Sequence, residues 1–135
     1  MRKGLIIVAV VCVVTALGVA SILRVRKTLK VPLVTVQAFS DAIASNDFKG
    51  AYALTSSDFK AADSLESFSK MQSHLVSEFG RPQRFESSSF DMETNQYGTH
   101  DTVEGRWIFQ NGQPVFKFDL KYENGRWLIF SFEQR

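Results

Sequence analysis

Few side chains in this sequence could perform acid–base or metal chemistry, and those few are far apart along the chain. The only two histidines, His74 and His100, belong to different expected elements. A zinc site needs three or four ligands, and no third ligand can be nominated beside them. His74 falls at the edge of the apolar stripe of an expected helix, whereas His100 and Asp101 fall where a turn is expected to lead into a strand. We therefore predict no metal site and no cofactor.

Nucleophilic catalysis has equally little support. The sequence contains no Ser, His and Asp in a catalytic order and no glycine-rich phosphate loop. Cys12 is the only cysteine and lies inside a long apolar run, where a thiol packs as a small hydrophobic group; palmitoylation and a disulfide between chains are the alternatives. Asp41 is interpreted as solvent-facing and Asp47 as a helix cap. We therefore predict no catalytic residue and expect the protein not to be an enzyme.

The apolar run extends from Leu5 to Leu23 and contains nineteen residues without a charge. As a helix it would be about 28 Å long, close to the thickness of the hydrocarbon core of a bilayer. Basic residues lie on both sides of it, and every acidic residue of the chain follows it. Residues 1–30 are therefore predicted to form a single-pass membrane anchor with basic flanks, and residues 31–135 to form one domain.

This apolar run has two other interpretations. A cleaved signal peptide could exit at Gly18-Val19-Ala20, but the run is long and Arg24 to Lys27 resembles a stop-transfer flank. A pilin leader would place Phe and Glu where this chain has Leu5 and Ala9. The uncleaved anchor is preferred.

The orientation of the anchor depends on charges that conflict. Four basic residues follow the run and two precede it, which by the positive-inside rule slightly favours a cytoplasmic domain. A short basic N-terminal tail commonly stays inside, however, and we expect the C-terminal domain to be extracytoplasmic.

The net charge of the domain excludes one class of partner. Residues 1–30 carry six basic and no acidic residues, which leaves ten basic against fourteen acidic residues in 31–135. This mildly acidic domain has no Lys/Arg stripe of the kind that phosphate neutralisation requires. No nucleic-acid binding is expected.

Apolar residues follow a helical period in the first half of the domain. A helix is expected over 31–46, a second short helix from Phe48, and a third helix from a capping box at 63–66 to Gly80. The apolar stripe of the third helix is expected to comprise Leu65, Phe68, Met71 or Gln72, Leu75 and Phe79.

After Pro82 the apolar residues follow a period of two, which indicates strands near 84–93, 101–110, 114–123 and 126–134. Asn111-Gly112 and Asn124-Gly125 are expected to form type I′ turns. The last strand is apolar on both faces, so it is expected to be central or covered on both sides. Helices followed by an antiparallel sheet predict an α+β fold, with about three helices packed on four strands.

The stretch Val36–Ser56, with Asn46-Asp47-Phe48 and Ala51-Tyr52-Ala53-Leu54 inside it, resembles the opening of small bacterial NTF2-like (cystatin-like) domains. Gly125-Arg126-Trp127-Leu128-Ile129 is similar to the end of their sheets, whereas Asn46 replaces the usual glycine. The resemblance implies a cone between helices and sheet. Its interior is a predicted ligand pocket, lined by Phe39, Tyr52, Phe68, Trp107 and Phe118.

Together these features predict a membrane-tethered, non-enzymatic binding or assembly module. It would present an NTF2-like domain to a protein partner or a small apolar ligand, and a homodimer is a further option. The alternatives are a ligand-pocket enzyme of the NTF2-like type and an assembly factor for a membrane respiratory complex.

Overall fold

The structure is a computed structural model that describes residues 31–135. The predicted anchor at 5–23, with Cys12 and the basic flanks, lies outside the described residues. Within residues 31–135, no helix has the length and apolar character needed to cross a bilayer. The elements in chain order are α2 (Pro32–Ala44), α3 (Phe48–Ala53), α4 (Ser57–Ala62), α5 (Leu65–Phe79), β1 (Pro82–Asn95), β2 (Gly98–Phe109), β3 (Val115–Glu123) and β4 (Arg126–Gln134).

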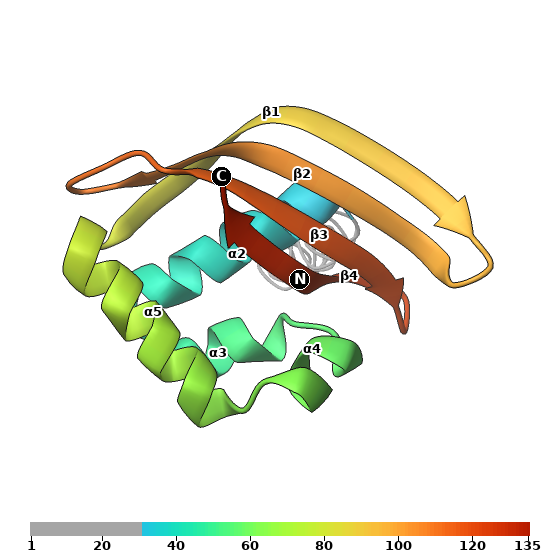
Figure 1. The fold of residues 1–135 in the computed structure, drawn as a ribbon, viewed down its shortest axis with the longest axis horizontal. Helices are drawn as coiled ribbons and strands as arrows, with labels where there is room; N and C mark the ends of the chain where they lie inside the picture. Colours follow the sequence, from blue (N-terminus) through green and yellow to red (C-terminus); the bar gives the residue numbers. More distant parts are fainter. Residues whose placement is uncertain (1–30) are drawn as a thin grey trace, which may run out of the picture.

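The four strands form one antiparallel sheet in the order β1-β2-β3-β4, and it curves over the helices on one face (Figure 1). The predicted α+β architecture of helices on a four-stranded antiparallel sheet is confirmed. The described chain has four helices rather than three. The sequence did not reveal α4 because a helix of six residues is too short to show a period, and none of its residues is buried.

Side-chain caps explain where α3 and α5 begin. Asp47 accepts a hydrogen bond from the Gly50 amide at 2.9 Å, as the sequence predicted. Asn46 before it has a φ of 59°, a conformation that Asn tolerates, which explains how it can replace a glycine. The predicted acidic cap of α5 is wrong: Ser64 caps this helix by accepting from the Ser67 amide at 3.1 Å, because Asp63 terminates α4.

The β1–β2 hairpin is longer than predicted, because β1 reaches Asn95 and β2 begins at Gly98. His100 and Asp101 therefore lie within β2, paired with Glu93 and Met92 of β1. The expected solvated turn at these two residues is wrong, and Asp101 is only 4% exposed.

The last strand, β4, is an edge strand rather than a central one. A central position therefore does not explain why β4 has apolar residues on both faces; a bulge does. The register shifts beside Asp119 and Leu120, which pair with Ser131 and Ile129 and leave Phe130 as a bulge. A bulge adds one residue to the strand, so Ile129 and Phe132, three positions apart, both face the helices. The outer edge of β4 is covered at Ile129, whose backbone bonds to Leu54 and Ser56.

The two predicted Asn-Gly turns differ. Asn124 and Gly125 have φ values of 52° and 80°, as a type I′ turn requires. Neither Asn111 nor Gly112 has a positive φ. Gly112 instead bridges to Phe109, which places Gln110 and Asn111 at the tip of that connection, so the type I′ prediction there is wrong.

The core between the helices and the sheet is mostly aromatic. The Phe39 ring of α2 lies within 5.5–6.0 Å of the rings of Phe68, Trp107, Phe118 and Phe132. The Trp107 indole donates a hydrogen bond to the Ser40 hydroxyl at 2.9 Å, which satisfies the one polar atom of that ring. This packing fixes α2 across the sheet.

Candidate functional site

The five aromatic residues predicted to line a ligand pocket lie in the packed core. Phe39, Phe68, Trp107 and Phe118 are fully buried. Tyr52 is partly buried and packs against that core, with its hydroxyl donating to the Asp63 carbonyl at 2.7 Å. The rings contact one another, and none of the five lines the cavity described next.

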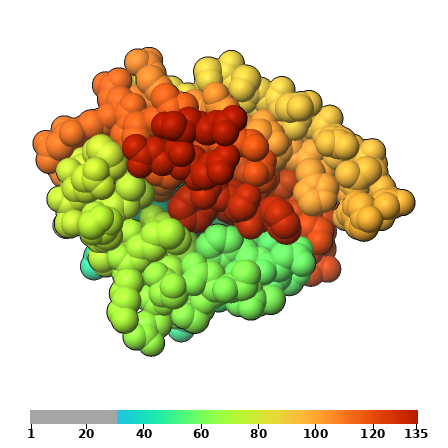
Figure 2. Space-filling model, in the orientation of Figure 1, coloured from blue at the N-terminus to red at the C-terminus, as the bar shows by residue number. Residues whose placement is uncertain are grey.

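A cavity of about 230 Å³ lies between α5 and the adjacent ends of β3 and β4. Helix α5 contributes Gln72, Leu75 and Glu78, and the sheet contributes Phe116 and Phe132. In Figure 2 the molecule is hollowed between the yellow-green atoms of α5 and the dark-red atoms of β4.

The apolar stripe of α5 explains why this space exists. Phe68, near the start of the helix, is buried in the core, and Phe79 at its end packs on Phe109 with ring centroids 5.5 Å apart. The two stripe positions between these anchors hold Gln72 and Leu75, whose side chains are smaller than phenylalanine. A helix held at both ends over smaller middle residues leaves an unfilled volume against the sheet.

Gln72 is the most unusual side chain of the cavity. It is 0% exposed, yet neither its Oε1 nor its Nε2 has a hydrogen-bond partner within residues 31–135. A buried polar group left without a partner costs about 1–3 kcal/mol. The sequence leaves Met71 and Gln72 as alternatives at this position of the apolar stripe of α5. The structure buries Gln72 and exposes Met71. Leu65, also expected in the stripe, is exposed as well.

The rim of the cavity carries acidic groups. Glu78 and Glu133 both line it, together with the exposed His74. Glu133 is in contact with Arg135, with Nη1 3.3 Å from Oε1, and this pair is exposed. A ligand entering here therefore meets apolar walls, one buried carboxamide and an acidic rim.

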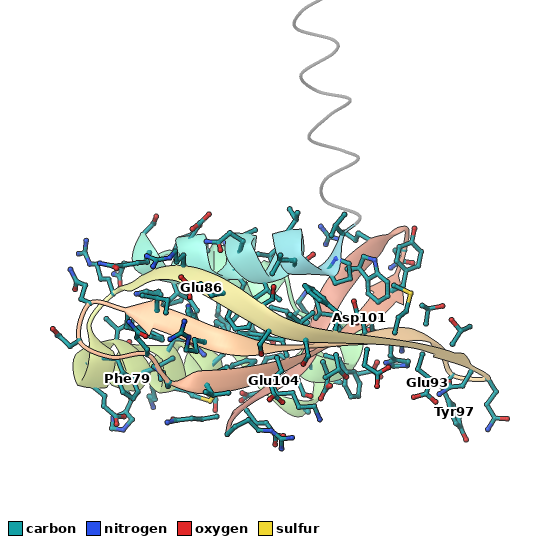
Figure 3. All side chains as sticks on the ribbon, turned by 90° about the horizontal axis from the view of Figure 1, so that it is seen from above. Phe79, Glu86, Glu93, Tyr97, Asp101 and Glu104 are labelled. Atoms are coloured by element: carbon teal, nitrogen blue, oxygen red, sulfur yellow. The ribbon has the colours of Figure 1, made fainter. Side chains whose placement is uncertain are left out.

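Asp101 is a second buried polar group, and its position is separate from the cavity. Its Oδ1 has no partner among the described residues, and its neighbours across the strands are Met92 and Leu120. Burial raises the pKa of the Asp101 carboxyl above its ordinary value; the charge of Asp91 acts in the same direction, and hydrogen bonds from backbone amides oppose it. Figure 3 shows Asp101 and Phe79 towards opposite ends of the sheet.

Alternation along β2 could have revealed Asp101. It shares its face with Val103, Gly105 and Trp107, all expected to point to one side, so period two places the carboxyl on the buried face. His100 points to the other face, where its ring lies 5.9 Å from that of Phe130. No group of three or more metal-ligating side chains is found within residues 31–135.

Comparisons with known proteins support the fold. No family model matches the chain, and no curated protein matches it. The chain is similar to a crystal structure from Nostoc punctiforme, described as a protein of unknown function with a cystatin-like fold. The TM-score is 0.53 at 19% identity, covering 72% of this chain and 81% of that one.

It is also similar to an NTF-2 like protein of unknown function from Shewanella oneidensis, with a TM-score of 0.53 at 13% identity. That match covers 74% of this chain and 92% of the other. At such low identities the comparisons show the fold alone. The class of protein is therefore an α+β domain with the NTF2-like, or cystatin-like, fold.

Proposed function

We propose that this chain is a non-enzymatic, membrane-tethered binding module whose NTF2-like domain holds a protein partner or small ligand in the cavity between α5 and β4. The observation that carries the proposal is Gln72, whose buried carboxamide lines this cavity with both polar atoms unpaired. Because native proteins satisfy nearly all buried polar groups, the unpaired amide is explained by a ligand that supplies its partners.

The chemistry of the cavity defines its ligand. A carboxamide offers donors at nitrogen and an acceptor at oxygen, so its complement has both an acceptor and a donor. Leu75, Phe116 and Phe132 supply apolar walls. Ligand pockets commonly measure about 300–1,000 Å³, and a volume of about 230 Å³ suits a group of side-chain size rather than a large cofactor.

The membrane tether is part of the proposal and is supported by the sequence. The uncharged run at 5–23 is separated from Val31 by seven residues, four of which are basic. Such a basic flank can contact anionic headgroups beside the span. The domain would then be held close to the bilayer, on its extracytoplasmic side.

A titration of the cavity with small amides tests the binding function. The isotope-labelled full chain in mild detergent is titrated with N-methylacetamide while the side-chain amide resonances are followed by NMR. We expect the Gln72 resonance to shift and saturate. The Gln37 amide, which bonds to Asp41 and to the Phe85 N–H, serves as an internal reference and should not saturate.

Matched variants make this titration decisive. Gln72→Met should abolish the saturable response of the neighbouring Leu75 and Phe132 resonances, whereas Gln96→Met, at an exposed position, should leave it unchanged. A Gln72 resonance that does not move, or that drifts linearly like exposed amides, would contradict the proposed function.

A further inference from the structure

We propose that the partner is an extended peptide segment that adds as a strand to the free edge of β4, with one carboxamide side chain inserted into the cavity against Gln72. This inference rests on the proposed function and names the class of its partner. It follows from three features that meet at the same place: a free strand edge, the unpaired buried amide and an acidic rim.

The first feature is the backbone edge of β4 beyond the bulge at Phe130. The Arg135 N–H donates to the Val115 carbonyl at 2.8 Å, so Arg135 points its backbone towards β3. Along an antiparallel strand, successive residues point their backbone N–H and C=O groups alternately towards and away from the neighbouring strand. Phe132 and Gln134 therefore direct these groups away from β3. No other segment within residues 31–135 pairs with them.

The same edge already pairs with an extended segment closer to its start. The Ile129 N–H donates to the Leu54 carbonyl at 2.9 Å, and the Ile129 carbonyl accepts from the Ser56 amide at 2.8 Å. This forms a parallel bridge between Thr55 and Ile129. An added peptide would continue this pairing along Phe132 and Gln134, and free edges of this kind are templates for β-strand addition.

The edge and the cavity are contiguous. Phe132 and Gln134, whose backbone groups are free, also line the cavity that holds Gln72, and Figure 2 shows the dark-red end of β4 at the surface beside the hollow. Since alternate side chains of a strand point to the same side, a peptide along this edge can direct one residue into the cavity. An Asn or Gln side chain there offers both the donor and the acceptor that Gln72 lacks.

The charge of the rim selects basic flanking residues. Glu78 and Glu133 line the cavity, and none of the residues lining it is Lys or Arg. Arg135 is paired with Glu133, so Glu78 is the carboxylate of the rim that is open to a basic side chain. A peptide with Lys or Arg on either side of its carboxamide residue is therefore complementary to the site. The basic segment of this chain at 24–30, Arg-Val-Arg-Lys-Thr-Leu-Lys, contains no Asn or Gln, so a partner fits the site better than the chain itself.

The experiment uses the full chain in mild detergent and the capped peptide acetyl-Lys-Val-Gln-Val-Lys-amide, with affinity measured by NMR or calorimetry. Replacing the peptide Gln by Leu should weaken binding about tenfold or more, on the scale of one buried hydrogen-bonded group. Gln72→Met should weaken binding of the Gln peptide to a similar degree. Combining the two changes should add little, because both remove the same contact.

Two further controls measure separately what backbone pairing at the β4 edge and the charge of the rim contribute to peptide affinity. Methylation of the peptide backbone nitrogens removes the donors needed for strand addition and should abolish binding. Glu78→Gln should reduce affinity several-fold and lower its salt dependence, whereas Glu66→Gln, at the far end of α5 and paired with Lys70, should change neither.

The outcomes distinguish this inference from the function on which it rests. If N-methylacetamide saturates Gln72 but the peptide does not bind, or the methylated peptide binds equally well, the peptide proposal is wrong and the binding function stands. If self-association of the chain blocks the edge and competes with the peptide, the occupant is a second copy and the peptide proposal is wrong. If neither amide nor peptide binds, both proposals are wrong.

Discussion

At the scale of single residues, Gln72 makes a prediction about stability. Gln72→Met removes an unpaired buried carboxamide and keeps a similar volume, so it should raise the free energy of unfolding of the ligand-free protein by about 1–2 kcal/mol. Urea denaturation of the full chain measures this change. Such a gain would support the proposal that the Gln72 amide serves binding rather than the fold.

The matched control is Gln37→Met, because the Gln37 amide bonds to Asp41 and to the Phe85 N–H and its loss should destabilise. If Gln72→Met destabilises as much as Gln37→Met, the Gln72 amide is satisfied in the folded protein, and the argument for a ligand fails.

Asp101 predicts a dependence of stability on pH. Its pKa is raised in the folded state, mainly by burial, so the folded protein holds this proton more tightly than the unfolded chain. The resulting stabilisation is complete below the unfolded pKa of about 3.9 and is lost as the pH rises through the folded value. Asp101→Asn should therefore gain stability relative to wild type as the pH is raised, and then level off.

Denaturation curves of both proteins from pH 3 to pH 8 measure this difference. Glu93→Gln is the comparison at an exposed position of β1, because Glu93 does not contribute to the raised pKa of Asp101, and its effect should be smaller. A difference between Asp101→Asn and wild type that is constant over the whole range would show that Asp101 has an ordinary pKa.

At the scale of elements, the start of α5 distinguishes two neighbouring caps. The Ser64 hydroxyl accepts a hydrogen bond from the Ser67 amide, whereas the Asp63 side chain makes no hydrogen bond within residues 31–135. The Asp63 backbone carbonyl accepts from the Tyr52 hydroxyl. Ser64→Ala should therefore cost about 1 kcal/mol of stability and Asp63→Ala clearly less. Thermal unfolding of the two variants checks this order, and the reverse order would restore the acidic cap that the sequence suggested.

Strand β4 shows how one local irregularity changes the role of an element. Strict alternation would place Phe132 on the face opposite Ile129. The bulge at Phe130 returns Phe132 to the core, where it stacks on Phe118 with centroids 5.8 Å apart. The same strand then supplies the core with its side chains and the proposed site with its free backbone edge.

At the scale of the whole molecule, the proposed tether predicts where the chain is found in cells. The full chain should remain with membranes after alkaline carbonate extraction, because about twenty apolar residues insert stably in a bilayer. Val13→Arg with Val14→Arg should release a large fraction, since each charge at the centre of a span costs about 2.5–3.5 kcal/mol. Release of the full chain from membranes by alkaline carbonate would contradict the proposed tether.

The side of the membrane needs its own measurement. Protease added to intact cells should digest residues 31–135 if the domain is extracytoplasmic. Digestion only after lysis would reverse the proposed orientation, and it would agree with the four basic residues that follow the apolar run.

The sequence alone determined the order of elements and the class of fold. Apolar periods of 3.6 and then two separated the helices from the strands, Asp47 marked one helix start, and Asn124-Gly125 marked one hairpin, because each of these signals is local. The resemblance around residues 36–56 led to the same NTF2-like fold. The sequence could not show α4, which has no buried residue, or the order of strands that makes β4 an edge.

Only the tertiary structure decided where a site could be. A period places a residue on a face, as it does for Asp101 on the buried face of β2, but it does not say what lies opposite. The sequence therefore could not show that neither Gln72 nor Asp101 Oδ1 finds a hydrogen-bond partner within residues 31–135. The five aromatic residues expected to line a pocket lie in the packed core. The cavity instead opens where α5 carries Gln72 and Leu75, both smaller than phenylalanine, over the sheet. The position of the cavity depends on α5, β3 and β4, which come from different parts of the chain. The spacing of residues along the sequence does not show how far apart such elements lie in the fold.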